Sequence, residues 1–340
     1  MKRREFHALG LQTLAGLGAA AAAWPGQAQS PAPVPRPPGP GGYPDRPIKL
    51  IVPYPAGGIV DVVMRTVTDP LSAELPQRIV VENRTGADGR IGINAAAQAA
   101  PDGYTLVAAT PIVAVGEHLF PDMAGRSKSF TGLCGIAAPP SVWVVWSGLP
   151  VRNLAELIAL AKAKPETLNA ANPGSGSSLH LAQEMLFERT GMKVTNITYK
   201  GQPPALIDMA EGRVHFGLIS QTLALPLLQS GKLRALASNT ARRTRSLPEV
   251  PTVGEAGHPD ALVQSWYGLA TVRGTPAPIV QYLGDQLMAT LAQPAVRAKL
   301  DAMDADYMGT GPQAFDQLIQ AEVQRWGQLI RARGIKASAT

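Results

Sequence analysis

Three short segments combine glycines, prolines and hydroxyl side chains in a pattern that suits the binding of an anion. They are Pro53-Tyr54-Pro55-Ala56-Gly57-Gly58, Thr110-Pro111 and Asn172-Pro173-Gly174-Ser175-Gly176-Ser177-Ser178. Glycine leaves backbone N–H groups free to point at a ligand, and a helix that begins behind such a loop adds roughly half a positive charge. Small residues with free amides and hydroxyls can therefore hold an oxyanion without an arginine.

Two ionisable residues follow these loops closely in the sequence. Asp61 is expected in the first turn of a helix, where a carboxylate suits the positive end of the dipole. His180 is expected one turn from a helix start, which disfavours an imidazolium, so we interpret it as a neutral orienting or purely structural histidine. Gly57-Gly58 is also compatible with a simple tight turn, whereas the Ser/Gly loop at 172–178 is richer than a turn requires.

The sequence contains no motif of a known catalytic or cofactor site. It has no G-x-S-x-G elbow, phosphate-binding G-x-x-x-x-G-K-[ST] loop, H-E-x-x-H pair or C-x-x-C pair. The glycines at 86, 89 and 92 do not match the dinucleotide fingerprint. Ser177 or Ser178 with His180 would lack an orienting carboxylate. Cys134 is the sole cysteine, so we expect a buried core residue rather than a disulfide or a metal centre. We therefore expect no enzyme, no metal and no cofactor.

Apolar patterns place these loops at the ends of strands. Short β-rich runs alternate with helical patterns, and the strands are expected at 48–53, 79–81, 105–109, 142–146, 168–171, 194–199, 214–220 and 233–238. The segment 278–335 is expected to be largely helical. This alternation predicts an α/β fold with two mostly parallel sheets flanked by helices, which bind ligands beyond the carboxyl ends of their strands.

The first residues predict export. Lys2-Arg3-Arg4, an apolar stretch and Gly26-Gln27-Ala28 are typical of an export leader over 1–28. The paired arginines favour a twin-arginine signal, with an ordinary secretory leader as the alternative. Residues 29–42 are interpreted as a linker, because 31–42 contain six prolines and three glycines, and folded structure is expected from near Tyr43.

Composition limits the remaining classes of protein. The 340 residues suit two lobes, and 45% hydrophobic residues are enough to build cores. The net charge of +6 falls to +4 when Lys2, Arg3, Arg4 and Glu5 leave with the leader. This charge is too small and dispersed to predict nucleic-acid binding. No run after the leader reaches the roughly 18 to 20 apolar residues of a membrane span, so we expect a protein that does not span the membrane once the leader is removed.

A set of ordered motifs resembles the Bug family. They are Tyr43-Pro44-Asp45-Arg46-Pro47-Ile48, Ile51-Val52-Pro53-Tyr54, Gly57-Gly58-x-x-Asp61, Val81-Glu82-Asn83-Arg84, Pro101-Asp102-Gly103-Tyr104-Thr105-Leu106, Tyr199-Lys200-Gly201, Leu247-Pro248-Glu249-Val250-Pro251-Thr252, Ser265-Trp266-Tyr267-Gly268 and Thr275-Pro276-Ala277. Bug proteins are extracytoplasmic receptors similar to the solute-binding component of tripartite tricarboxylate transporters. The resemblance extends over 43–336.

The resemblance implies a two-lobed, type II-like periplasmic binding protein. It would close on a small carboxylate in the cleft between its lobes and deliver it to membrane permease subunits. The implied lobes are 43–141 with 264–340, and 142–263, with hinges near 139–141 and 263–265. The residues implied to contact ligand are Tyr54, Gly57, Gly58, Thr110, Ser175, Ser177 and Ser178, with Gln202, Ser220 and Gln221 on the rim of the second lobe. Asp61 and His180 join these candidates from the loops described above.

Two positions depart from the family pattern. Many relatives have an aspartate near Ser220, and its absence from Leu218-Ile219-Ser220-Gln221-Thr222 makes an amino-acid ligand less expected. Ile59-Val60 replaces a small polar pair and predicts a more apolar pocket. A ligand sensor for a signalling partner, or an enzyme on the same scaffold, are the alternative functions.

Overall fold

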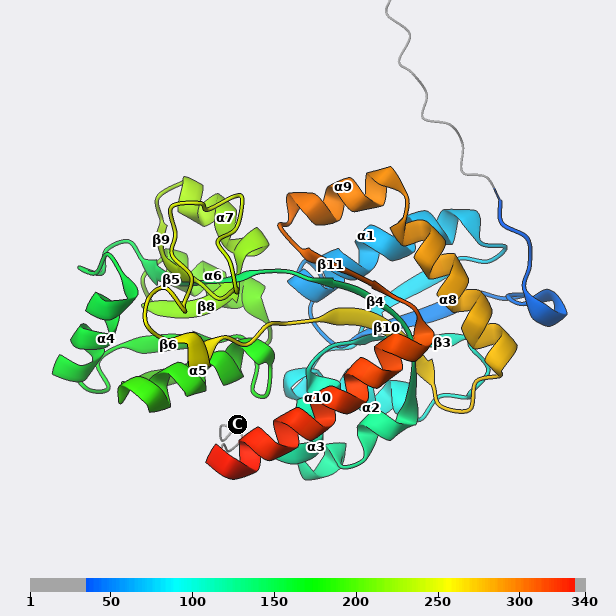
Figure 1. Cartoon of the computed structure of the whole chain (residues 1–340), viewed down its shortest axis with the longest axis horizontal. Helices are drawn as coiled ribbons and strands as arrows, with labels where there is room; N and C mark the ends of the chain where they lie inside the picture. Colours follow the sequence, from blue (N-terminus) through cyan, green and yellow to red (C-terminus); the bar gives the residue numbers. More distant parts are fainter. Residues whose placement is uncertain (1–34, 334–340) are drawn as a thin grey trace, which may run out of the picture. The chain divides into compact units, whose positions relative to one another are not determined.

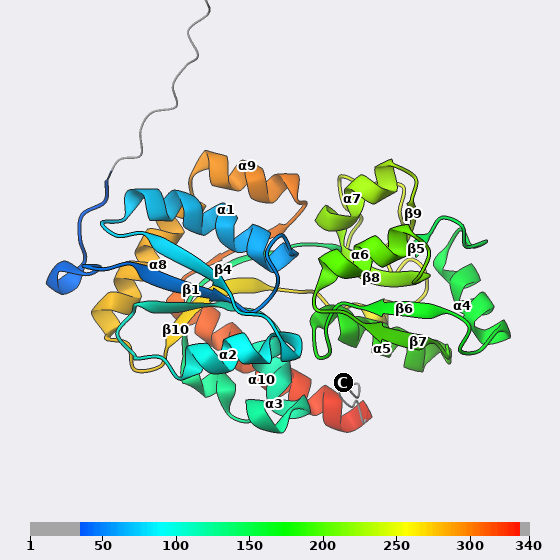
Figure 2. The same cartoon turned by 180° about the vertical axis from the view of Figure 1, so that it is seen from behind.

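The computed structural model describes residues 35–333, so the proposed leader at 1–28 and the first residues of the proposed linker lie outside the described residues. The described residues belong to one compact unit. This unit contains two β-sheets, each flanked by helices, as Figures 1 and 2 show. The predicted two-lobed α/β fold is confirmed. Below, the first lobe is the six-stranded sheet with its helices, and the second lobe is the five-stranded sheet with its helices.

The first sheet is built from two separate parts of the chain. Its strand order is β11-β4-β10-β3-β1-β2. The strands are β1 (Ile48–Val52), β2 (Ile79–Asn83), β3 (Thr105–Ala109), β4 (Phe130–Ala138), β10 (Tyr267–Val272) and β11 (Asp306–Thr310). Strands β1, β2 and β3 are parallel, whereas β10 runs antiparallel to β3 and β4, and β11 runs antiparallel to β4.

The second sheet has the strand order β7-β6-β8-β5-β9. Its strands are β5 (Ser141–Trp146), β6 (Asn169–Asn172), β7 (Thr195–Thr198), β8 (Phe216–Ser220) and β9 (Leu233–Ser238). Strands β6, β7 and β8 are parallel, and β5 is antiparallel to both β8 and β9. Both sheets are therefore mixed, and most of their strands share one direction, as predicted: β1 to β4 in the first sheet and β6 to β9 in the second. The strands that run against the common direction are β10 and β11 in the first sheet and β5 in the second.

Helices cover both faces of each sheet. They are α1 (Ile59–Glu74), α2 (Arg90–Ala97), α3 (Ile112–Leu119), α4 (Leu154–Ala163), α5 (Ser178–Thr190), α6 (Gln202–Ala210), α7 (Gln221–Gln229), α8 (Ala277–Leu291), α9 (Pro294–Ala302) and α10 (Pro312–Arg333). Figure 1 shows α4 to α7 around the second sheet and the other helices around the first. The segment predicted as largely helical therefore contains α8, α9 and α10, interrupted by β11.

Alternation along the strands explains why each sheet is buried on both faces. In β1, Leu50 and Val52 join one apolar cluster with α1 and α8, whereas Ile51 joins another with α2 and α3. In β5, Trp143 and Val142 enter different clusters in the same way. Successive side chains of a strand point to opposite faces, so an unbroken apolar run suits a sheet covered on both sides.

Cys134 of β4 is completely buried, as predicted. Burial raises the pKa of its thiol to about 12. The thiol therefore stays protonated at neutral pH and behaves as a small apolar core group.

The chain crosses between the sheets at the β4–β5 junction and again between β9 and β10. We propose the predicted division of the folded chain into 43–141 with 264–340, and 142–263, because all strands of the second sheet lie within 141–238. Contacts between the lobes include the Ser178 Oγ to Ser265 Oγ hydrogen bond of 2.5 Å. The last turns of α10 also reach the core of the second lobe through Trp326 and Ile330.

Folded structure begins earlier than the sequence predicts. Arg36, inside the proposed linker, forms an ion pair with Glu74 and donates hydrogen bonds to the Gln286 carbonyl at 2.7 Å and the Thr290 hydroxyl at 3.0 Å. This part of the proposed linker is thus fixed to α1 and α8, because one arginine finds partners on both helices. Among the described helices, none has the length and apolar character needed to cross a membrane.

Candidate ligand-binding site

The first loop connects β1 to α1 and is held by Asp61. Gly57 has a positive φ of 74°, a conformation that glycine adopts without strain. Its N–H donates to the Asp61 carboxylate at 3.0 Å, which also accepts from Arg65 Nε and from Asn83 Nδ2 at 2.9 Å. Burial alone would raise the pKa of Asp61, but the hydrogen bonds from Asn83, Gly57 and Arg65 outweigh it and keep the pKa below its usual value. Asp61 therefore shapes the loop rather than facing a ligand.

The Ser/Gly loop connects β6 to α5, and His180 fixes its shape from inside. The N–H of Gly176 donates to His180 Nδ1 at 3.1 Å. Since Nδ1 accepts, the ring proton lies on Nε2, which is 3.4 Å from the Glu184 carboxylate. His180 is thus placed to orient the loop through Gly176. Ser177 caps the helix, and its Oγ accepts the N–H of His180 at 3.1 Å.

Two tyrosines of the first lobe stand beside the short loop that follows β3. Burial raises the pKa of Tyr54, and a hydrogen bond with Thr110 partly offsets this effect. Tyr267 begins β10, where Gly268 pairs with Ala109, so its side chain lies next to the Thr110 loop. Burial raises the pKa of Tyr267 to about 12, with a smaller opposing effect from its hydrogen bond to Ser265. Both phenols are therefore neutral hydroxyl groups at physiological pH.

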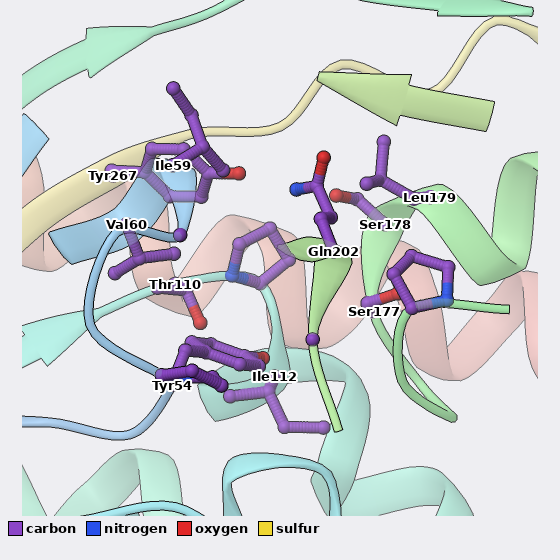
Figure 3. Close-up of a pocket in the computed structure, with 15 residues that line it drawn as sticks. Tyr54, Ile59, Val60, Thr110, Ile112, Ser177, Ser178, Leu179, Gln202 and Tyr267 are labelled. Carbon is purple, nitrogen blue, oxygen red and sulfur yellow. The ribbon is translucent and has the colours of Figure 1, made fainter. Parts of the chain in front are cut away.

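Gln202 supplies an oriented amide from the second lobe. Its Oε1 accepts the backbone N–H of Ser220 at 2.7 Å, which fixes the orientation of the amide. The two Nε2 hydrogens remain as donors. Figure 3 shows the Gln202 amide and the Tyr267 hydroxyl facing each other across the pocket.

These groups surround a small cavity between the two lobes. Its volume is about 50 Å³. Residues from both sheets line it: Tyr54, Pro55, Gly58, Ile59, Val60, Thr110, Pro111, Ile112, Pro173, Ser177, Ser178, Leu179, Gly201, Gln202 and Tyr267. Figure 3 shows aliphatic side chains and hydroxyl groups sharing its wall. None of these lining residues, all within the described part of the chain, carries a charged side chain.

Four helices begin at the wall of this cavity. The lining includes the first residues of α1 (Ile59), α3 (Ile112) and α6 (Gln202), and Ser178 at the start of α5. The first backbone N–H groups of a helix have no acceptor within the helix, and each N-terminus carries roughly half a positive charge. The cavity is therefore positive without a single formal cation, which suits an anion.

Six of the twelve predicted ligand residues line the cavity. They are Tyr54, Gly58, Thr110, Ser177, Ser178 and Gln202. Gly57, Asp61, Ser175, His180, Ser220 and Gln221 do not. For Gly57, Asp61, His180 and Ser220 the reason is the hydrogen bonds given above, which use these groups to fix the loops and the Gln202 amide.

Ser175 and Gln221 are engaged in other contacts between segments. Ser175 is completely buried. Burial raises the pKa of Asp88 of the first lobe, and a backbone hydrogen bond from Ser175 partly offsets this rise, whereas the Ser175 hydroxyl has no hydrogen-bond partner among the described residues. The Gln221 amide donates to Asp304 at 2.9 Å and accepts from Thr244 at 2.9 Å, near the crossing between the lobes. Neither side chain lines this cavity, and their contact with ligand stays a prediction. Among residues 35–333, no group of three or more His, Cys, Asp or Glu side chains is placed to hold a metal ion.

Sequence reasoning missed several lining residues. Tyr267, Leu179 and Ile112 were not singled out, and neither was Gly201, which stood only in a family motif. The sequence could have indicated Leu179 and Ile112 as lining residues, because each lies at the start of a helix directly after a predicted ligand loop. Tyr267, like Gly201, stood only in a family motif, and no local pattern places it at the cavity because its position depends on strand pairing.

Solved structures define the class of protein. The periplasmic binding protein BugD matches with a TM-score of 0.82 and 30% identity, over 86% of this chain and 99% of that chain. An R. palustris protein solved with adipate matches with a TM-score of 0.82 and 34% identity, over 86% and 99%. The fold is therefore that of a periplasmic binding protein.

The sequence comparison gives the family. The family model described as "Tripartite tricarboxylate transporter family receptor" matches residues 63–335, and this chain belongs to that receptor family. Protein BugT of Bordetella pertussis is 35% identical over 297 residues, which cover 86% of this chain and 91% of BugT. The resemblance to the Bug family noted in the sequence is confirmed.

Proposed function

We propose that this protein captures a small carboxylate in the cavity between its lobes and delivers it to the permease of a tripartite tricarboxylate-type transporter. One observation carries the proposal: four helix N-termini meet at a buried cavity whose lining residues, within the described chain, include no charged side chain. A carboxylate offers two oxygens with about four acceptor sites, so it matches a wall of donors.

The donors come from both lobes. The first lobe offers the N–H groups at the start of α1 and the hydroxyl of Thr110, and the second offers those at the start of α5 and the Gln202 amide. A carboxylate that bonds to both sets favours the arrangement in which the lobes meet. Charge-assisted hydrogen bonds are stronger in a site shielded from water, so closure strengthens each of them.

The transporter partner and the cellular location follow from the family. The matched receptors serve tripartite tricarboxylate transporters, and BugD is a periplasmic protein. We infer that this chain acts in the periplasm as a receptor rather than as an enzyme. The sequence of residues 1–28, typical of an export leader, supports the same location.

A thermal-shift screen of the purified protein tests the proposal. The panel contains mono-, di- and tricarboxylates, with a neutral sugar and a simple amine as controls. A ligand at a hundred times its Kd stabilises the folded state by about 2.7 kcal/mol, which raises the Tm by roughly 5 °C for a protein of this size. If no carboxylate raises the Tm, or only the controls do, the proposal is wrong.

A further inference from the structure

The wall of the binding cavity is mainly apolar. Ile59, Val60, Ile112 and Leu179 line it together with three prolines. Its volume of about 50 Å³ corresponds to roughly four water-sized spheres, at 10–15 Å³ each. The cavity thus has room for one compact anionic group and a short body, and that body would contact hydrocarbon.

Among the described residues that line this cavity, none is a cation that could pair with a second carboxylate. Arg65 is the basic residue beside the first loop, and its Nε is bound to the Asp61 carboxylate at 3.0 Å. The exposed Lys200 lines a separate cavity of about 410 Å³ together with Arg90, whose guanidinium pairs with Asp122 at 2.5 Å. Burying a second charge without a partner is strongly unfavourable.

A contact between the lobes separates the two cavities. Gly201 and Pro55 line both of them. A Cβ added to Gly201 would lie 2.9 Å from Cδ of Pro55, so the proline ring packs directly against the glycine backbone. A ligand would have to pass this contact before a distal carboxylate could reach Lys200.

The two serines of the second lobe that line the cavity are engaged within the protein. Ser178 Oγ is bound to Ser265 Oγ at 2.5 Å, and Ser177 Oγ accepts the His180 N–H. The Gln202 amide nitrogen is the side-chain donor that remains unengaged among these three lining residues. Together with the Thr110 hydroxyl and the helix N-termini, this amide forms a donor set that converges on one small space and matches the oxygens of one carboxylate.

We propose that the preferred ligand is a short monocarboxylate with an apolar body, and that dicarboxylates of the same carbon number are discriminated against. The inference rests on the proposed function, since it names the class of carboxylate for the same site. The apolar pair Ile59-Val60 and the small volume of the cavity, about 50 Å³, are the features that set this preference.

Isothermal titration calorimetry with acids matched in carbon number tests this preference for monocarboxylates. The purified protein is titrated at pH 7 with propionate against malonate, butyrate against succinate, and with adipate alone. We expect each monocarboxylate to bind at least tenfold more tightly than its matched dicarboxylate. Equal or tighter binding of the dicarboxylates, or binding of adipate alone, overturns the inference and leaves the proposed function standing. If no carboxylate binds, the proposed function itself fails.

Matched variants separate the effect of an apolar cavity wall on binding from general effects of a substitution in α1. Val60→Thr adds a hydroxyl to the cavity at nearly constant volume, and Val62→Thr makes the same change in the same turn of α1 outside the lining. We expect Val60→Thr to weaken butyrate binding about threefold to tenfold and Val62→Thr to leave it unchanged. Lys200→Gln should not alter butyrate affinity. If Lys200→Gln weakens binding of the preferred ligand severalfold, the ligand extends past Gly201 and the inference is wrong.

Discussion

Gly58 is the position at which one substitution tests the anion site most directly. It is buried, lines the cavity and is the N-cap of α1, with φ of −72° and ψ of 160° that other residues also adopt. In Gly58→Asp the new carboxylate would lie about 4 Å from the ligand carboxylate, because both occupy the same small space. Two like charges at that distance repel by about 4 kcal/mol at an effective dielectric constant of 20, which is roughly a thousandfold in affinity.

Gly58→Asn is the matched control. Asn has nearly the same shape as Asp and is equally favourable at an N-cap, so both variants should fold, and both must accommodate a Cβ 3.1 Å from the Pro55 carbonyl oxygen. Calorimetry on the best carboxylate from the screen should show a loss of at least a hundredfold for Asp and of no more than about tenfold for Asn. If the two variants bind alike, charge at residue 58 is irrelevant and the ligand anion does not sit at the start of α1.

Three further predictions concern the lobe contact, the oriented amide and the loop carboxylate. Gly201→Ala, at φ of 100° and ψ of 178° and against Pro55, should weaken binding about tenfold. Gly191→Ala, at the milder left-handed φ of 70° and ψ of 23° with no neighbour within 4 Å, should bind normally in the same titration. Gln202→Glu should weaken carboxylate binding about a hundredfold at pH 7, and unchanged affinity would remove this amide from the site. Asp61→Asn should lower the free energy of unfolding by about 2 kcal/mol in urea at pH 7. Because the pKa of Asp61 is held below its ordinary 3.8, its contribution is present above that value and is lost as the pH falls through the lowered pKa, so wild type and variant should converge in acid. A difference that persists there would contradict the ionic role.

The strands and helices whose apolar residues follow a regular spacing were predictable from the sequence. The expected strand at 48–53 corresponds to β1 (Ile48–Val52), and Asp61 lies in the first turn of α1 (Ile59–Glu74), as expected. Strand β4 (Phe130–Ala138) was missed because its glycines suggest a loop. Packing explains such glycines: a Cβ on Gly132 would lie 2.7 Å from the backbone nitrogen of Asp316 on α10. Strand β11 was missed because none of its residues is buried and its sequence therefore carries no apolar pattern.

The candidate site was predictable where its chemistry is local. The loops around Gly58 and Ser177 were predicted because glycine and serine directly before a helix form a pattern of a few residues that indicates an anion site. Gln221 was placed at the ligand because it follows a strand end, but the direction of its side chain is set by Asp304, which the sequence cannot relate to it. Tyr267 reaches the cavity through the pairing of Gly268 with Ala109, a relation between distant strands.

The buried thiol of Cys134 has a practical consequence for watching the lobes move. It is the single cysteine of the chain, it has no exposed surface, and burial raises its pKa to about 12. Thiolate is the form that reacts with maleimide dyes, so the native protein should remain unlabelled under mild conditions. One exposed cysteine introduced into each lobe would then carry a donor–acceptor dye pair without prior removal of Cys134, and fluorescence transfer would report closure in real time.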